Sequence, residues 1–236
     1  MRVIAFVQAR LSSRRLPGKI LKDLRGRPAL DYLLEALEHA SGLDQFVLAT
    51  SSDPSDEPTV RFADRRGVPC FRGPLDDVAS RLLLAAREYR ADAIVRISGD
   101  SPLMDPQVID RAVGLFREGS ADIVTNVRPR TFPKGQSVEI VATTALASAV
   151  GRMRGPEERE HVTPFIYAHP EEYRMRSFIT DDARPEVQLC IDDPEDFVRC
   201  AAILAALSGP PWQLGWRACV AAYDDYCARS RVGVSA

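Results

Sequence analysis

The sequence is poor in the residues that build disulfide frameworks, zinc sites and membrane spans. Its five cysteines are odd in number and form no Cys-x-x-Cys pair, which favours reduced, buried thiols over disulfides or zinc. The first residues, MRVIAFVQAR, lack the pattern of a secretory signal peptide, so we expect a cytoplasmic protein. No apolar run approaches the ~20 residues that span a bilayer, so we expect no membrane partner.

Two glycine-rich fingerprints of nucleotide-binding proteins are also missing. The sequence contains neither G-x-x-x-x-G-K-[ST] nor G-x-G-x-x-G. Its three histidines make no recognisable Ser-His-Asp or Cys-His arrangement, and its net charge is −2. A slightly acidic chain has no general field that attracts nucleic acid, so we expect no nucleic-acid partner and only local anion sites.

Strand-like and helix-like segments alternate through the first half of the 236 residues. The patterns predict strands over residues 2–7, 45–50, 68–73, 92–100 and 121–126, and helices over residues 28–41, 58–67, 76–91 and 105–119. This alternation predicts an α/β fold, a three-layer, doubly wound and mostly parallel sheet. The length fits a single domain over residues 1–236.

The second half is less regular. Prolines and glycines interrupt residues 128–178. Within this stretch we expect loop structure followed by a strand over residues 127–143, and a helix over residues 142–153. We predict a last buried strand over residues 187–192 and a helix over residues 193–207, with Asp193 as its N-cap.

A dense basic loop, VQARLSSRRLPGK (residues 7–19), directly follows the first predicted strand. In open α/β sheets the carboxyl ends of the strands are where ligands bind. Arg10, Arg15 and Lys19, together with loop N–H groups, suit a chain of phosphates. The alternative is a solvated basic turn without a ligand. The position of the loop and the absence of any acid within it favour a phosphate site.

Two aspartates follow predicted strands that are far apart in the sequence. Asp100 lies in RISGDSPLMDP and Asp192 in LCIDDPEDF, so both are expected at the same sheet edge as the basic loop. Mg²⁺ commonly takes one or two protein carboxylates, with phosphate oxygens and water as its other ligands. We therefore hypothesise that Asp100 and Asp192 share a Mg²⁺ ion; the alternative for Asp100 is a simple turn residue after Gly99.

Five ordered blocks of the sequence resemble a known family. They are VQARLSSRRLPGK, RGPLDDVASRL, VRISGDSPLMDP, EREHVTPFIY and IDDPEDF. Together they resemble the cytidylyltransferases of the spore-coat polysaccharide (SpsF-like) type, which are related to CMP-sialic acid and CMP-3-deoxy-manno-octulosonate synthetases. The resemblance covers nearly the whole chain.

This resemblance implies a nucleotide-diphospho-sugar transferase-like fold, usually a homodimer in which residues 128–178 pack on the partner or face the acceptor. It implies a Mg²⁺-dependent transfer of CMP from CTP to a small acceptor, with release of pyrophosphate, in polysaccharide or glycoconjugate precursor synthesis. Carried over by position, the implied catalytic residues are Lys19, Arg10 and Arg15; the nucleotide-binding residues also include Ala9, Ser12, Ser13, Arg81 and Ser98; the acceptor-binding residues are Gln136, Glu139 and His161; the metal ligands are Asp100 and Asp192.

The chain departs from the family pattern at three positions. Ser12 replaces a glycine, Arg14 replaces a threonine and thus adds a cation, and Ser137 replaces an aspartate in the segment expected to face the acceptor. The alternatives are a nucleotide-sugar-dependent glycosyltransferase and a non-catalytic nucleotide-binding protein. CTP rests on the resemblance alone, with GTP and UTP as open alternatives, and the acceptor can be a sugar acid, a sugar phosphate or a phosphonate.

Overall fold

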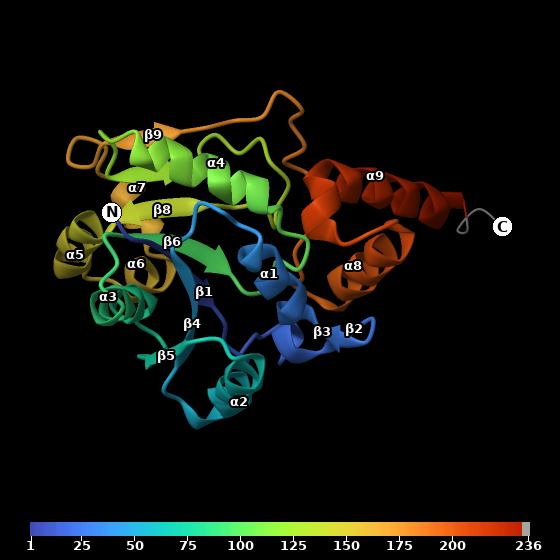
Figure 1. The fold of residues 1–236 in the computed structure, drawn as a ribbon, viewed down its shortest axis with the longest axis horizontal. Helices are drawn as coiled ribbons and strands as arrows, with labels where there is room; N and C mark the ends of the chain where they lie inside the picture. The colour runs from blue at the N-terminus through green and yellow to red at the C-terminus, as the bar shows by residue number, and fades with distance from the viewer. Residues whose placement is uncertain (233–236) are drawn as a thin grey trace.

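A seven-stranded sheet forms the centre of the molecule in the computed structural model, which describes residues 1–232 (Figure 1). Its strands are β1 (Val3–Gln8), β4 (Gln45–Ser51), β5 (Cys70–Gly73), β6 (Ala93–Ser98), β7 (Ile123–Thr125), β8 (Glu139–Ala142) and β9 (Met175–Ser177). They lie in the order β5-β4-β1-β6-β8-β7-β9. A separate hairpin pairs β2 (Asp23–Leu24) with β3 (Arg27–Pro28).

All strands of the seven-stranded sheet except β8 run in the same direction. β1 pairs in parallel with β4 and β6, β4 with β5, and β7 with β9, whereas β8 is antiparallel to both β6 and β7. This confirms the predicted mostly parallel sheet. The carboxyl ends of β1, β4, β5 and β6 therefore share one edge, which is where a doubly wound sheet binds its ligands.

Helices cover both faces of the sheet (Figure 1). One face packs against α1 (Ala29–Glu38), α2 (Glu57–Arg66), α4 (Pro106–Arg117), α8 (Pro194–Ala206) and α9 (Pro211–Val232). The other face packs against α3 (Val78–Glu88), α5 (Thr143–Arg152) and α7 (Thr163–Tyr167), and α6 (Pro156–His161) lies against α3. Two short 3-10 helices, η1 (Lys19–Leu21) and η2 (Pro54–Asp56), follow β1 and β4. The three-layer α/β fold is confirmed.

Asp-Pro pairs in the sequence mark the starts of two helices. The side chain of Asp105 accepts a hydrogen bond from the backbone N–H of Gln107 at 2.8 Å and caps α4. Asp193 likewise accepts from the N–H of Asp196 at 2.9 Å and caps α8. Each cap satisfies a backbone donor that the first helical turn leaves without a partner. These caps confirm the role of Asp193 expected from the sequence.

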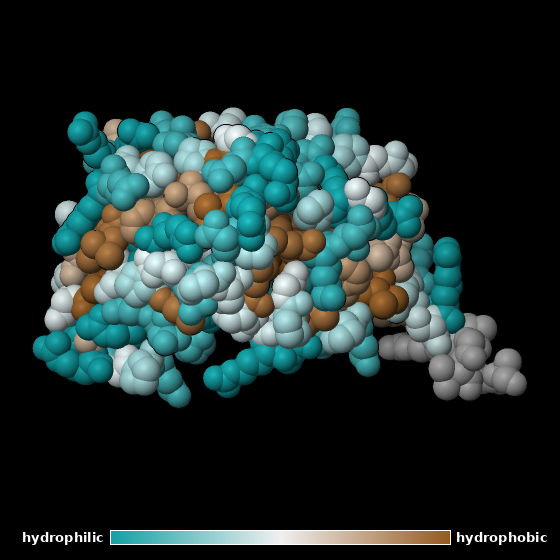
Figure 2. Space-filling view, turned by 90° about the horizontal axis from the view of Figure 1, so that it is seen from below, coloured by the Kyte–Doolittle hydropathy of each residue, from teal (hydrophilic) through white to brown (hydrophobic). Residues whose placement is uncertain are grey.

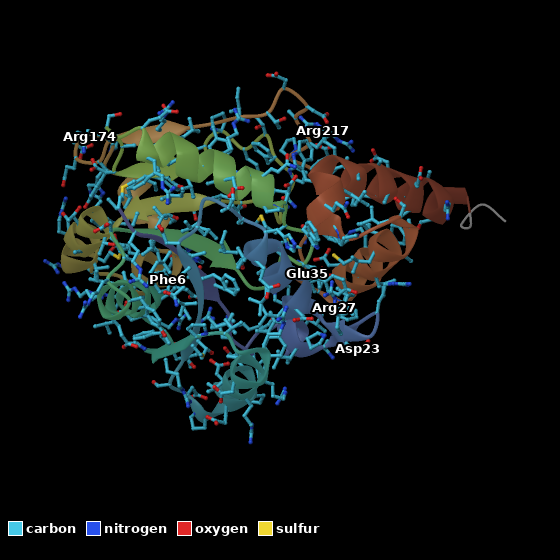
Figure 3. The ribbon with its side chains drawn as sticks, viewed as in Figure 1. Phe6, Asp23, Arg27, Glu35, Arg174 and Arg217 are labelled. Atoms are coloured by element: carbon cyan, nitrogen blue, oxygen red, sulfur yellow. The ribbon has the colours of Figure 1, made fainter. Side chains whose placement is uncertain are left out.

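A clamp fastens the β2–β3 hairpin to α1 directly after η1. Arg27 donates to Glu35 at 2.5 Å, and its guanidinium lies 3.7 Å from the ring centroid of Tyr32. Figure 3 shows Arg27 and Glu35 close together beside α1, with Asp23 nearby on the hairpin. The segment between β1 and α1, which includes the basic loop, is thus fixed at its start by β1 and at its end by this clamp.

The predicted strand over residues 187–192 is wrong. Its apolar residues are buried, but the segment is irregular and makes only one isolated bridge, between Gln188 and Lys134. Its backbone bonds go to loops instead, as when Ile191 N–H donates to the carbonyl of Asp100 at 2.9 Å. The continuous apolar run therefore indicates burial here but not a strand. No strand in the chain up to Val232 lies beside it to form a ladder of backbone hydrogen bonds.

Residues 128–178 contain more regular structure than predicted. β8 and α5 match the strand expected at the end of residues 127–143 and the helix expected over residues 142–153, whereas β9, α6 and α7 were not predicted. β8 and β9 belong to the central sheet, and α5 and α7 pack on one of its faces. The prediction also ended the last helix near residue 207 and gave no helix after it, whereas α9 covers residues up to Val232, with a kink at Gly215 where φ is 80°.

The surface is mixed. On the face drawn in Figure 2, hydrophobic residues emerge in several patches between hydrophilic ones. Within residues 1–232, no helix combines the length and apolar character that crossing a bilayer requires.

Candidate functional site

A cavity of about 800 Å³ opens where β1 and β6 end. Its walls are the basic loop after β1, the loop before α3, the segment that follows β6, and α6. The residues nominated from the sequence that line it are Arg10, Ser12, Ser13, Arg15, Lys19, Ser98, Asp100, His161 and Asp192. The fold thus brings the predicted phosphate-binding loop and both predicted metal ligands into one cavity.

The basic loop is a closed turn with a buried anchor. Gly18 N–H donates to the carbonyl of Leu11 at 3.0 Å and closes the turn. Leu11 N–H donates to Asp56 at 2.7 Å, and Asp56, which is fully buried in η2, also accepts from Ser51. Gly18 has φ of 68°, a conformation that glycine adopts without strain. The loop geometry is therefore set from beneath by a carboxylate that the sequence analysis did not nominate.

Lys19 is the central cation of the site. Its side chain, 11% exposed, donates to Asp100 at 2.5 Å, to the carbonyl of Ile191 at 2.5 Å and to Asp192 at 3.3 Å. One ammonium group thus contacts both Asp100 and Asp192, which are far apart in the sequence. The predicted convergence of Asp100 and Asp192 is present in the fold.

The two carboxylates have the donor chemistry that Mg²⁺ needs. Both Asp100 and Asp192 face a positive charge from Lys19, so the pair already forms a place for a cation. Two protein carboxylates leave the remaining positions of a Mg²⁺ ion for phosphate oxygens and water. The described residues contain no cluster of three or more His, Cys, Asp or Glu that would hold a metal by itself. The donor set fits an ion that arrives with a nucleotide.

Other cations of the loop are also paired with acids. Arg10 donates to Glu160 of α6 at 2.8 Å, and Arg15 contacts Asp192 at 3.0 Å. The hydrogen bond from Arg10 lowers the pKa of Glu160, so this carboxylate stays charged at neutral pH. Arg14, the cation that departs from the family pattern, lines the same cavity. The site is thus largely neutralised by its own acids, and an anionic ligand would replace them.

The ends of β1 and β6 approach so closely that one position tolerates only glycine. Gly99 N–H donates to the carbonyl of Gln8 at 2.9 Å, and a Cβ at Gly99 would lie 2.8 Å from that oxygen. This contact places Ser98 and Asp100 beside the basic loop. Ala9, predicted to bind the nucleotide, is fully buried and does not line the cavity.

Arg81 lies under the cavity wall. It is fully buried, and its Nη1 donates to the carbonyls of Pro74 at 2.7 Å and Leu75 at 3.2 Å. Burial is the main cause that lowers the pKa of Arg81, to about 10, and the charge of Arg10 lowers it further. Leu75 lines the cavity, so Arg81 contributes by holding the loop before α3.

Two residues nominated for the acceptor do not line the cavity. Gln136 is fully buried, accepts from Asp105 N–H at 2.9 Å and donates to the carbonyl of Leu103 at 2.6 Å. Both ends of its amide are therefore engaged in holding another loop, and we do not carry it into the acceptor site. Glu139 is 5% exposed and bonds to Arg96 at 2.6 Å, so it faces a side chain of the cavity wall.

Sequence reasoning missed several residues of the site. Arg96 and Glu160 line the cavity, and Asp56 anchors the loop. Arg96 and Glu160 lie inside two of the family-like blocks, VRISGDSPLMDP and EREHVTPFIY, so a signal was present. Asp56 follows the second strand in SSDPSDEP, at the edge where ligands bind. An aspartate in such a segment is common in turns, so its type and position did not single it out.

An open α/β sheet with a basic loop after its first strand and two aspartates at the same edge defines a nucleotide-binding protein of the nucleotide-diphospho-sugar transferase fold. The family model described as cytidylyltransferase matches residues 4–207. The chain belongs to the cytidylyltransferase family and is a nucleotidyltransferase.

Individual relatives agree with this assignment. A solved structure of a cytidylyltransferase from Leptospira borgpetersenii serovar Hardjo-bovis (strain JB197) has a TM-score of 0.86 and 30% identity, and the match covers 100% of this chain and 96% of that one. The spore coat polysaccharide biosynthesis protein SpsF of Bacillus subtilis (strain 168) is 29% identical, over 85% of each chain. A structure of CMP:2-keto-3-deoxy-manno-octonic acid synthetase complexed with CTP shares the fold, with a TM-score of 0.68 and 17% identity over 87% of this chain and 99% of that one.

Proposed function

We propose that this enzyme transfers CMP from CTP to a small sugar acid, sugar phosphate or related acceptor and releases pyrophosphate, in polysaccharide or glycoconjugate precursor synthesis. The observation that carries the proposal is the meeting of Lys19, Asp100 and Asp192 beside the basic loop, within one cavity. The family supports CMP transfer, because SpsF and the CMP:2-keto-3-deoxy-manno-octonic acid synthetase are similar to this chain.

The basic loop has the chemistry to neutralise a triphosphate. An acceptor oxygen attacks the α-phosphorus in line, the bond to the leaving pyrophosphate breaks, and negative charge grows on the oxygens that leave. Arg10, Arg15 and Lys19 are the cations that we assign to these phosphates, and the loop backbone at Ser12 and Ser13 supplies N–H donors. Arginine forks suit phosphate oxygens, whereas a lysine follows the moving charge as a point cation.

We assign Asp100 and Asp192 to a Mg²⁺ ion that binds together with the nucleotide. Mg²⁺ would supply positive charge to the phosphate oxygens and help to orient them. In this proposal Lys19, which now neutralises both carboxylates, becomes available to the phosphates once the carboxylates have another cation.

We also propose that the enzyme is a homodimer and acts in the cytoplasm. The edge strand β9 lies in residues 128–178 and exposes Met175, and Ile179 just after it is 47% exposed. An unpaired edge with exposed apolar side chains favours association with another copy. Light scattering after gel filtration tests this part, and a monomer at micromolar concentration would refute it.

A pyrophosphate-release screen tests the reaction. The four nucleoside triphosphates are each combined with Mg²⁺ and a panel of sugar acids, sugar phosphates and phosphonates. We expect release with CTP and at least one acceptor, and none without Mg²⁺. Release from GTP or UTP alone would reject cytosine specificity, and a glycosyltransferase would release no pyrophosphate from any triphosphate.

A further inference from the structure

A row of polar side chains crosses the sheet beneath the cavity. Arg96 of β6 stands in register with Glu139 of β8, and Glu139 with Thr125 of β7. Phe6 of β1, labelled in Figure 3, is the register partner of Arg96 on the other side and marks where the row begins. Alternate strand residues face the same side, so Arg96 and Ser98 share a face, and both line the cavity.

Glu139 and Tyr167 fix the orientation of Arg96. The Nη1 of Arg96 donates to Glu139 at 2.6 Å, and the hydroxyl of Tyr167 in α7 donates to the other oxygen of Glu139 at 2.5 Å. The Tyr167 oxygen also lies 3.0 Å from the hydroxyl of Thr125, which can donate to it. Glu139 is buried, and burial is the main cause that raises the pKa of Tyr167, so its hydroxyl keeps its proton at neutral pH. The carboxylate is held from both sides and cannot follow a ligand into the cavity.

The other edge of the Arg96 guanidinium has no acceptor in the described part of the chain. Its Nε is buried without a hydrogen-bond partner, and Nη2 makes no hydrogen bond there either. A buried donor without an acceptor is unfavourable, so an acceptor at this edge would be favoured. Nε and Nη2 form the planar pair of N–H groups that binds two oxygens of one carboxylate or phosphate.

The other cations of the cavity come from the basic loop or the helix that follows it. Arg10 pairs with Glu160, Arg15 with Asp192, and Lys19 with both Asp100 and Asp192. Arg14 also belongs to this loop. Arg96 lies two residues before the end of β6 at Ser98, about 7 Å back along the strand, whereas Asp100 lies beyond the strand end. Arg96 is thus a separate cationic point in the same cavity.

We propose that Arg96 binds the anionic group, a carboxylate or a phosphate, of the acceptor and so determines that the acceptor is an acid, with Glu139 and Tyr167 as positioning residues. This rests on the proposed function, since it assumes that the nucleotide occupies the loop side of the cavity. It replaces the direct acceptor contact expected of Glu139 with an indirect one through Arg96.

The test uses a non-reactive nucleotide and a minimal anion. The enzyme is saturated with Mg²⁺ and cytidine 5′-(α,β-methylene)triphosphate, and methylphosphonate is then titrated and followed by ³¹P NMR. We expect Arg96→Gln to weaken methylphosphonate binding about tenfold or more, in line with the loss of a charged hydrogen bond, and to leave the affinity for the nucleotide analogue within twofold. Arg96→Lys should lie between, because it keeps the charge without the planar edge.

Two further variants separate this role from general effects. Arg14→Gln removes one charge from the same cavity and should keep the methylphosphonate affinity within twofold once the analogue is saturating. Tyr167→Phe removes only the hydroxyl that holds Glu139, and should weaken methylphosphonate a few-fold, as expected for one hydrogen bond, without changing the affinity for the analogue.

Equal methylphosphonate affinity in the wild type and in Arg96→Gln would overturn the proposal, and so would a parallel loss of analogue affinity, which would make Arg96 a nucleotide residue. Failure of the wild type to bind the analogue would instead refute the proposed function. The difference between the wild type and Arg96→Gln in methylphosphonate binding remains measurable in that case.

Discussion

Lys19 holds two acids that would otherwise repel each other. Its ammonium contacts Asp100 and Asp192 within a site of restricted exposure, so each partner depends on the others for charge balance. The same three residues are those that a metal-bound triphosphate would rearrange. Both stability and turnover are therefore expected to respond when any one of them is changed.

Removing either central charge should abolish turnover. We expect Lys19→Ala and Asp100→Asn each to lower the rate of pyrophosphate release by ~10²–10³-fold, by analogy with other electrostatic stabilisers of a transition state. Circular dichroism should show an intact fold, with Arg90→Ala, a change far along the chain in a helix-end turn, as a control. Near-normal rates in both variants would reject the assignment of the site.

Glu160 should act as a competitor of the nucleotide. It bonds to Arg10 with both side chains partly exposed, and such pairs are worth ~0.2–1 kcal/mol. Glu160→Gln frees Arg10, so we expect the KM for CTP and the inhibition constant of pyrophosphate both to fall by up to about fivefold. Steady-state kinetics at pH 7.5 measure both. An increased KM for CTP would show instead that Glu160 helps to hold the substrate.

Some site residues were predictable from the sequence and others were not. Arg10, Arg15 and Lys19 were identified because they crowd one loop after a strand, and Asp100 because it ends another strand. Glu139 and Gln136, expected near the acceptor, do not line the cavity. A polar residue in a loop-rich segment looks the same in a sequence whether it lines a cavity or satisfies a buried donor. Only the register of β6 with β8 reveals that Glu139 serves Arg96.

At the scale of elements, the basic loop depends on η2. Asp56 is buried in η2 and accepts from Leu11 of the loop and from Ser51 at the end of β4. A single carboxylate therefore connects the loop to the neighbouring strand of the sheet. The contact between Asp56 and Leu11 therefore helps to fix the positions of the donors that we assign to the phosphates.

Asp56→Asn should loosen the loop without removing any cation. The amide offers one acceptor oxygen in place of two, so a buried donor loses its partner, at a cost of about 1–3 kcal/mol of unfolding free energy. We expect urea denaturation to show this loss and the KM for CTP to rise. Asp53→Asn, three residues earlier at the partly exposed N-cap of η2, is the matched control, because Asn caps a helix as well as Asp does. Equal effects of the two changes would contradict the anchoring role.

Element prediction succeeded where local signals agreed with the surroundings. Apolar runs predicted β1, β4, β5, β6 and β7, and Asp-Pro caps marked α4 and α8. It failed over residues 187–192, where an apolar run is buried without a neighbouring strand. It also failed over α9, which begins at Pro211, the last residue of a Ser-Gly-Pro-Pro run that usually ends a helix. Burial and pairing are decided by distant parts of the chain, which local patterns do not report.

At the scale of the whole molecule, four thiols make the free energy of unfolding depend on pH in the alkaline range. Burial raises the pKa of Cys70 to about 11 and that of Cys190, Cys200 and Cys219 to about 12. Above pH ~9 the unfolded chain loses these protons while the folded chain keeps them. The folded state then binds more protons, so the unfolding free energy must fall as pH rises.

We therefore expect urea denaturation to give a clearly lower unfolding free energy at pH 10 than at pH 8. The double variant Cys200→Ala with Cys219→Ala should lose part of this pH dependence, whatever its stability at pH 8. An unfolding free energy that stays constant between the two pH values would contradict the account of the buried thiols.

The central claim is that the loop cations and two distant aspartates surround one metal-bound nucleotide. A crystal structure of the enzyme with Mg²⁺ and cytidine 5′-(α,β-methylene)triphosphate measures this directly. We expect the triphosphate against Arg10, Arg15 and Lys19, and one Mg²⁺ bound by both Asp100 and Asp192. A nucleotide bound outside this cavity, or a metal that touches neither aspartate, would contradict the claim.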